Sequence, residues 1–151
     1  MPTTSDENSR DEAEIRTLIN DLTEKLRAKD VTGVMSRYAS EKVQFLLAPP
    51  LQYAGTNAIK AEDLAEWFSS FDGAIGYEVH GLQVAVGNQV AFCHALSRMS
   101  GTKIDGAKAD LWLRWTLGFR KIEGRWKITH EHESVPFYMD GSDRAALDLK
   151  P

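Results

Sequence analysis

The chain has 151 residues, of which 42% are hydrophobic and 26% charged, a composition typical of one globular domain. Its net charge of −4 at pH 7 and its scattered basic residues argue against a protein that binds nucleic acid through phosphates. No segment approaches the roughly 18 apolar residues of a membrane span. The polar first ten residues contain no apolar signal core, so we expect a cytoplasmic protein.

The chain divides into three expected segments. Residues 1–9 have the composition of a disordered leader, residues 10–140 form the domain, and residues 141–151 form a C-terminal tail. The single Cys93 cannot form a disulfide within the chain. Because it lies in an apolar stretch, we interpret it as a buried core residue in a reducing compartment.

The sequence pattern in the first half of the domain predicts three helices and one strand. Ser9 and Glu12 have capping-box spacing at the start of the first helix. Asp30 is expected to cap a short second helix that extends to Tyr38. A third helix follows Thr56 or Asn57. The apolar positions of the first helix are Ile15, Leu18, Ile19, Leu22 and Leu26; those of the third are Leu64, Trp67, Phe68 and Phe71. A short strand, Val43 to Leu47, lies between the second and third helices and stops at two prolines.

The second half changes to the period of two that is typical of strands. Four long strands are expected, at residues 77–86, 89–99, 109–121 and 125–134. Helices followed by consecutive hairpins predict a single α+β domain. In it, a curved antiparallel sheet wraps around the N-terminal helices.

The last hairpin allows two registers. A three-residue loop with Gly124 in the left-handed position pairs Arg114 with His132 and Thr116 with His130. A two-residue turn instead slips the pairing by one residue and places Trp115 and Leu117 with the histidines. We favour the first, because glycine suits the third position of that loop.

In the favoured register one sheet face is mixed apolar and polar, as is usual for a small-molecule pocket. It carries Asp110, Trp112, Arg114, Thr116, Trp126, Ile128, His130 and His132, and by parity His94, Leu96 and Arg98. Trp67 and Tyr53 are candidates to line the same cavity. The opposite face carries Leu111, Leu113, Trp115, Leu117 and Phe119 opposite Lys127, Thr129, Glu131 and Glu133, and is expected to pack against a second subunit.

Each polar residue also has a structural interpretation. His94 fits a satisfied core histidine. Arg114 fits a buried ion pair with Asp110 or with an acidic residue of a covering helix. The pair His130 and His132 fits a dimer interface. His130 and His132 supply only two metal ligands, so we expect no metal site. No phosphate-loop or dinucleotide motif is present, so we expect no cofactor.

The order of elements and the ending LRWTLGFRKIEGRWKITHEHESVPF resemble the SnoaL-like and ketosteroid-isomerase-like members of the nuclear transport factor 2-like superfamily. The ending also resembles the association domain of calcium/calmodulin-dependent kinase II. The resemblance implies a cone-shaped fold with an interior pocket, and dimers that pack through their sheets. Ketosteroid isomerases use a tyrosine with two acidic residues, and the sequence shows no Asp or Glu at a matching strand position.

Two functions stay open from the sequence. The first is an isomerase, cyclase or dehydratase that acts on a small apolar carbonyl or carboxylate compound, anionic compounds included. His130 or His132 is then the general base, and Arg114 stabilises an enolate or holds a carboxylate. The second is a non-catalytic dimeric module that binds a ligand or another protein through the same cavity.

Overall fold

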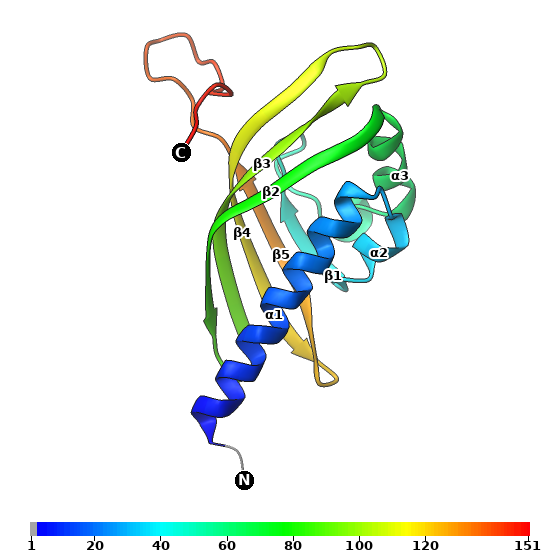
Figure 1. Cartoon of the computed structure of the whole chain (residues 1–151). Coiled ribbons are helices and arrows are strands. Elements are labelled where there is room, and N and C mark those ends of the chain that lie inside the picture. The colour runs from blue at the N-terminus through cyan, green and yellow to red at the C-terminus, as the bar shows by residue number, and fades with distance from the viewer. Residues whose placement is uncertain (1–2) are drawn as a thin grey trace.

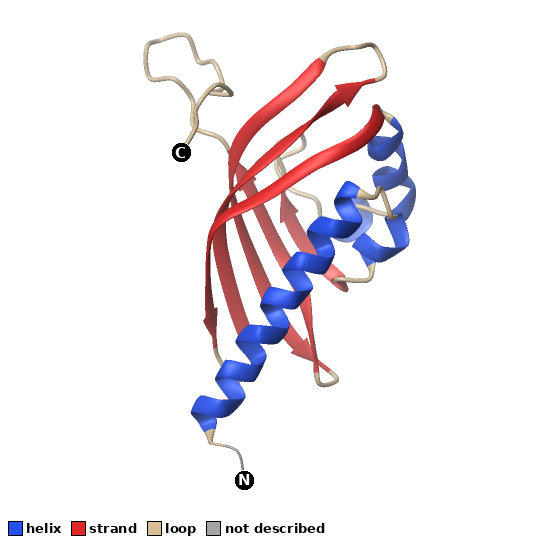
Figure 2. Ribbon diagram, viewed as in Figure 1, coloured by secondary structure: helices blue, strands red, loops and turns tan. Residues whose placement is uncertain are grey.

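The structure is a computed structural model that describes residues 3–151, and it has the expected α+β architecture (Figure 1). Helices α1 (Thr4–Arg27), α2 (Val31–Met35) and α3 (Ala61–Ser69) lie on one side of a single curved sheet (Figure 2). The strands are β1 (Tyr38–Phe45), β2 (Phe71–Val86), β3 (Val90–Lys103), β4 (Lys108–Ile122) and β5 (Arg125–Ser134). None of the helices in the described part of the chain is apolar over a length that would cross a bilayer.

Helix α1 begins earlier than the sequence predicted. It starts at Thr4, and Thr3 rather than Ser9 caps it, accepting a hydrogen bond from the Asp6 backbone. Acidic residues in the first turn match the helix dipole, so the polar segment assigned to a disordered leader extends the helix instead. Residues 1 and 2 of that leader lie outside the described residues.

Two strands also start earlier than predicted. Tyr38, expected at the end of the second helix, begins β1, and Phe71, expected in the third helix, begins β2. The sheet order is β1-β5-β4-β3-β2, so β1 joins the hairpins at an edge and runs parallel to β5. This long-range pairing leaves no signal in the local sequence pattern.

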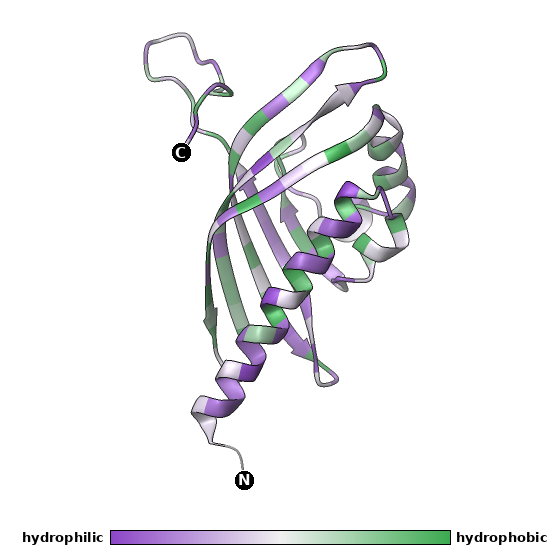
Figure 3. Cartoon of the chain, in the orientation of Figure 1, coloured by the Kyte–Doolittle hydropathy of each residue, from purple (hydrophilic) through white to green (hydrophobic). Residues whose placement is uncertain are grey.

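One face of the sheet packs against α1 and is called the inner face; the other is called the open face. Burial alternates along β3 and β4, and bands of hydrophobic and hydrophilic residues alternate along α1 and the strands (Figure 3). The core joins Ile15, Leu18, Ile19 and Leu22 of α1 to Cys93, Leu113, Trp115, Leu117, Phe119, Trp126 and Ile128 of the sheet. Cys93 is buried, as predicted. The Leu113–Phe119 face, expected to contact a second subunit, is therefore the core face.

The β4–β5 hairpin does not adopt the favoured three-residue loop. Ile122 pairs with Arg125 across a two-residue turn, with φ of 51° at Glu123 and 79° at Gly124. A β-bulge then follows: Phe119 pairs with Ile128 while Gly118 pairs with His130, so Thr129 is the extra residue. Before Thr129 the even-numbered residues of β5 face the core; after it the odd-numbered residues do.

A buried ion pair ties α1 to this hairpin. Asp11 is 7% exposed and accepts hydrogen bonds from Lys121 Nζ and Trp126 Nε1, each at 3.0 Å. Burial acts to raise the pKa of Asp11, but the hydrogen bonds from Trp126 and Lys121 outweigh it and hold this pKa below its ordinary value of 3.8. The charged carboxylate is therefore the form that stabilises the fold.

We expect Asp11→Ala to lower the free energy of unfolding at pH 7 by about 3 kcal/mol, because Lys121 and Trp126 lose their buried acceptor. The folded-state pKa of Asp11 is lowered, so the loss is fully present above about pH 4 and narrows as the pH falls further. Urea unfolding followed by circular dichroism measures both effects. Glu14→Ala, at an exposed position of the same helix, is the matched control. Equal effects of the two substitutions would contradict the role of Asp11.

Candidate functional site

The structure brings five of the predicted site residues together on one face: His94, Arg114, Thr116, His130 and His132. Thr116 pairs with His132 across β4 and β5, and Arg114 pairs with Ser134. The predicted pairs, Arg114 with His132 and Thr116 with His130, are each wrong by two residues, because the tight turn and the bulge each shift the register by one. His94 is opposite Thr116, as its parity predicted.

These residues lie on the open face, away from the helices. The sequence suggested that these side chains project into a pocket between the sheet and the helices. In the structure they point away from α1. Trp126 and Ile128, predicted to share their face, are buried in the core instead, because the bulge at Thr129 reverses the parity.

The two histidines have close neighbours on β1. His130 Nδ1 lies 2.7 Å from the backbone oxygen of Val43. The ring of Phe45 packs edge-on against both imidazoles, with centroids 4.9 Å from His130 and 5.3 Å from His132. These contacts hold the imidazoles against the edge of the sheet.

Arg114 has no acidic partner among residues 3–151. Its Nε donates to Ser134 Oγ at 3.0 Å. The ion pair with Asp110 that the sequence allowed is formed by Arg98, at 2.8 Å, and the hydrogen bonds from Arg98 hold the pKa of Asp110 below its usual value. Trp112 packs edge-on against His80, with ring centroids 4.8 Å apart.

The remaining two predicted site residues lie apart from the open-face group. Trp67 on α3 packs against Phe68 and Phe71, with centroids 5.5 and 5.3 Å away. Tyr53 pairs with Gln44 through backbone hydrogen bonds, and its hydroxyl donates to the Pro49 carbonyl at 2.6 Å.

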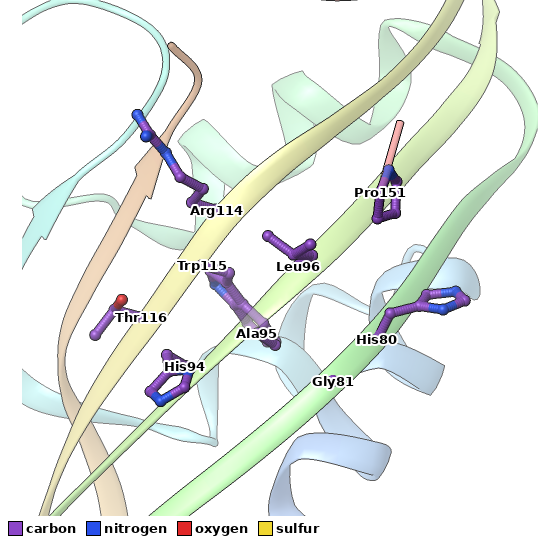
Figure 4. A pocket seen from close by; sticks show the side chains of 9 residues that line it. All are labelled: His80, Gly81, His94, Ala95, Leu96, Arg114, Trp115, Thr116 and Pro151. Carbon is purple, nitrogen blue, oxygen red and sulfur yellow. The ribbon is translucent and has the colours of Figure 1, made fainter. Parts of the chain in front are cut away.

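The open face carries a hollow of about 470 Å³. Figure 4 shows its lining on β2, β3 and β4, with the helices behind the strands. The lining residues are His80, Gly81, His94, Ala95, Leu96, Arg114, Trp115, Thr116 and Pro151. Among residues 3–151 no acidic side chain lines it, so the polar side chains of the lining carry imidazole, guanidinium and hydroxyl groups.

The inner face holds a second polar group, centred on Glu131. This carboxylate is 6% exposed and accepts three hydrogen bonds. The donors are Tyr38 Oη at 2.9 Å, Gln44 Nε2 at 2.8 Å and Trp115 Nε1 at 2.7 Å. Three donors and no acceptor fit an ionised carboxylate, because a protonated carboxyl also needs an acceptor for its own hydrogen.

Glu133 is next to Glu131 on the same face and is partly buried. Burial of its carboxyl, together with the charge of Glu131, raises the pKa of Glu133 to about 8. Glu133 therefore keeps its proton at neutral pH beside a charged neighbour. Burial and the same glutamates also raise the pKa values of Tyr38 and Tyr77 well above 10, so both phenols stay neutral.

Two buried polar atoms of the inner face have no partner in the described part of the chain. They are Oε1 of Gln44 and Oγ of Ser97. Buried polar groups almost always find a hydrogen-bond partner, so these two atoms are the unsatisfied polar positions of the inner face. Lys42 also lies on this side and is 9% exposed; burial lowers the pKa of its ammonium, while the charge of Glu131 acts to raise it. We call Tyr38, Lys42, Gln44, Tyr77, Ser97, Trp115, Glu131 and Glu133 the inner polar cluster.

Both glutamates of this cluster lie outside the site predicted from the sequence, because the favoured register kept one parity along the whole of β5. A signal was present: Trp126 and Ile128 must face the core, yet continuing their parity buries His130 and His132. A bulge between Ile128 and His130 lets the apolar pair face the core while the two histidines face outward.

Comparison with known proteins agrees with this architecture. The SnoaL-like domain family matches residues 15–138, which is most of the chain. The chain belongs to the SnoaL-like domain family. No curated protein matches this SnoaL-like chain at a significant level.

Three solved structures illustrate the range of its relatives. A nuclear transport factor 2-like protein of unknown function from Pseudomonas putida is 30% identical, with 95% of this chain and 98% of that chain covered and a TM-score of 0.83. A candidate scytalone dehydratase from Novosphingobium aromaticivorans is 15% identical, with 98% and 99% covered and a TM-score of 0.78. The association domain of the C. elegans kinase CaMKII is 15% identical, with 85% and 98% covered and a TM-score of 0.64. The last two likenesses show the fold alone.

The raised pKa of Glu133 makes the stability of this SnoaL-like protein depend on pH. Glu133 holds its proton up to about pH 8 in the folded state but releases it near 4.5 in the unfolded state, so stability falls as the pH rises between these values. We expect Glu133→Gln to leave stability unchanged at pH 4.5 and to raise it by about 1 to 3 kcal/mol at pH 8.5. Denaturant titrations at both pH values measure this change. Glu41→Gln, on the exposed side of β1, should show no such trend, and a Glu133→Gln effect independent of pH would contradict a buried, neutral carboxyl.

Proposed function

We propose that this chain is an enzyme that transfers protons next to the carbonyl group of a small apolar compound, and that the reaction is a dehydration or an isomerisation. The observation that carries the proposal is the pair of adjacent glutamates on the inner face. Glu131 is held as a carboxylate by three donors, and Glu133 stays protonated at neutral pH.

Such a pair supplies an acid and a carboxylate in one place. A carboxylic acid that keeps its proton next to a second carboxyl group is a common arrangement for combined acid and base catalysis. In a dehydration, Glu133 gives its proton to the leaving hydroxyl, which departs as water, and Glu131 receives the proton from the neighbouring carbon. The hydrogen bonds to Glu131 keep its carboxylate in position.

The charges of the inner polar cluster favour an uncharged substrate. The negative charge of Glu131 is offset by the ammonium of Lys42, and Arg114 lies on the other face of the sheet. The free atoms Gln44 Oε1 and Ser97 Oγ supply an acceptor and a hydroxyl for a polar substrate group. An anionic compound held by Arg114, the sequence-based alternative, belongs to the open face and not to this cluster.

The name of one structural neighbour supports the same reaction class. The Novosphingobium aromaticivorans protein with this fold is named as a candidate dehydratase. The catalytic roles predicted for His130, His132 and Arg114 need a substrate on the open face, where Glu133 cannot reach it. We therefore assign proton transfer to Glu133 and not to the histidines.

The proposal is tested with a panel of small cyclic β-hydroxy ketones, whose dehydration produces an enone that absorbs ultraviolet light. We expect Glu133→Gln to reduce kcat by about 10²–10⁴, because an amide cannot donate the proton that a carboxylic acid donates. The protonated acid is the active form, so the wild-type rate should fall as the pH rises through about 8. His132→Gln, on the open face, is the matched control. A fully active Glu133→Gln enzyme, or a greater loss with His132→Gln, would contradict the proposal.

A second proposed property is association through the open face. Val90, Phe92 and Leu96 are 55%, 52% and 40% exposed on that face, and exposed large apolar side chains grouped on one strand are typical of a protein interface. A neighbour with this fold is a kinase association domain, which agrees with the idea. We propose a homodimer in which the two open faces meet.

We expect the wild-type chain to sediment as a dimer at micromolar concentration. Phe92→Arg should weaken the dimer at least about tenfold, because it places a charge in the apolar patch. Ile104→Arg, at an exposed position in the β3–β4 loop, should leave the sedimentation coefficient unchanged. A wild-type monomer at all concentrations would contradict the proposed dimer.

A further inference from the structure

Residues 135–151, which we call the C-terminal arm, form a folded structure of their own. Phe137 pairs with Ala145, and backbone hydrogen bonds join Tyr138 to Arg144 and Ala146 to Pro136, each at 2.8 Å. The Tyr138 hydroxyl donates to Asp148. The arm projects from the end of β5 on the side of the sheet away from the helices (Figure 1). It is therefore preorganised.

The arm exposes more apolar surface than a folded segment of its size normally does. Met139 is 95% exposed and Phe137 64%, and Leu147 and Leu149 are about half exposed. Only Ala146 of the arm is fully buried. Four large apolar side chains on an ordered segment indicate a surface that another surface covers.

The hollow on the open face is complementary to the arm. Its walls are apolar at Leu96 and cationic or imidazole-bearing at Arg114, His80 and His94, with no acidic residue in the lining. The arm carries Asp140, Asp143 and Asp148 as well as Arg144 and Lys150, and none of the three aspartates forms an ion pair within the part of the chain that is described. The guanidinium of Arg114, free of acidic partners there, is a suitable site for one of these carboxylates.

The arm does not fill the hollow of its own chain. Only Pro151 of the arm lines it, beside Leu96 in Figure 4, while the exposed apolar residues and the aspartates lie elsewhere. Within one chain the arm thus covers the hollow at Pro151 alone, and its exposed apolar side chains stay uncovered. A two-fold axis through the open face brings the arm of each copy to the face of the other.

We propose that the C-terminal arm of one copy docks into the open-face hollow of a second copy, and that the contact is reciprocal. Apolar side chains of the arm cover Leu96 and its neighbours, and an aspartate of the arm pairs with Arg114. The inference rests on the proposed open-face dimer and is independent of catalysis by Glu133. Most of the arm lies beyond the SnoaL-like match, which ends at residue 138.

Cross-linking between chains tests the contact directly. Met139→Cys and His94→Cys are made in separate chains, mixed in equal amounts, allowed to exchange protomers and treated with a short bis-maleimide. Reciprocal docking predicts a covalent dimer that contains one chain of each kind. A mixture of Leu51→Cys with His94→Cys should give no such dimer, although Leu51 is 97% exposed. Native Cys93 is buried and should not react.

Sedimentation of a second variant separates the possible outcomes. Phe137→Ser combined with Met139→Ser should raise the dimer dissociation constant at least about tenfold, and Leu51→Ser should not change it. A dimer that this double variant does not weaken, with no cross-link from Met139→Cys, would overturn the arm contact and leave the open-face dimer standing. A chain that is monomeric at all concentrations would overturn both. Neither outcome bears on turnover by Glu133.

Discussion

The β-bulge at Thr129 determines what each face of the sheet can do. Before it, β5 directs Trp126 and Ile128 to the core; after it, the strand directs Glu131 and Glu133 inward and His130 and His132 outward. Without the extra residue, the imidazoles would face α1 and both carboxylates would face outward. Because of the bulge, the carboxyl groups of β5 lie on the inner face, and its imidazoles lie on the open face together with the guanidinium of Arg114.

Glu131 links this backbone feature to the chemistry. Its three donors come from β1 and β4, so the carboxylate joins an edge strand to the centre of the sheet. Burying a carboxylate is unfavourable unless hydrogen bonds compensate for the lost water, and here they do. The retained charge of Glu131 then adds to burial in keeping the proton on Glu133. The buried carboxylate of Glu131 thus both binds β1 to the sheet and keeps Glu133 protonated.

Much of this fold was predictable from the sequence. The α+β class and the four long strands follow from alternation. Arg114, Thr116, His94, His130 and His132 were also expected on one face, but through a three-residue loop without a bulge. In the structure the two-residue turn and the bulge at Thr129 together restore that parity. The parallel pairing of β1 with β5 was not predictable, because it joins residues about ninety positions apart that share no local pattern. The bulge was missed because it changes the parity of β5 without changing its composition; its trace in the sequence is the polar His130 and His132 at the parity of the core residues Trp126 and Ile128. The early start of α1 was missed because its first turn is polar, and capping rather than hydrophobic periodicity stabilises it.

The central claim is that Glu133 is a neutral carboxylic acid at physiological pH, and an NMR titration tests it most directly. The carboxyl carbon of Glu133 is followed by 13C NMR, and its resonance is assigned by its absence from the Glu133→Gln spectrum. The structure predicts a titration midpoint near 8 for this group. A midpoint near 4.5, the ordinary value for a glutamate, would mean that Glu133 is charged and solvated at neutral pH, and it would contradict the proposed acid catalysis.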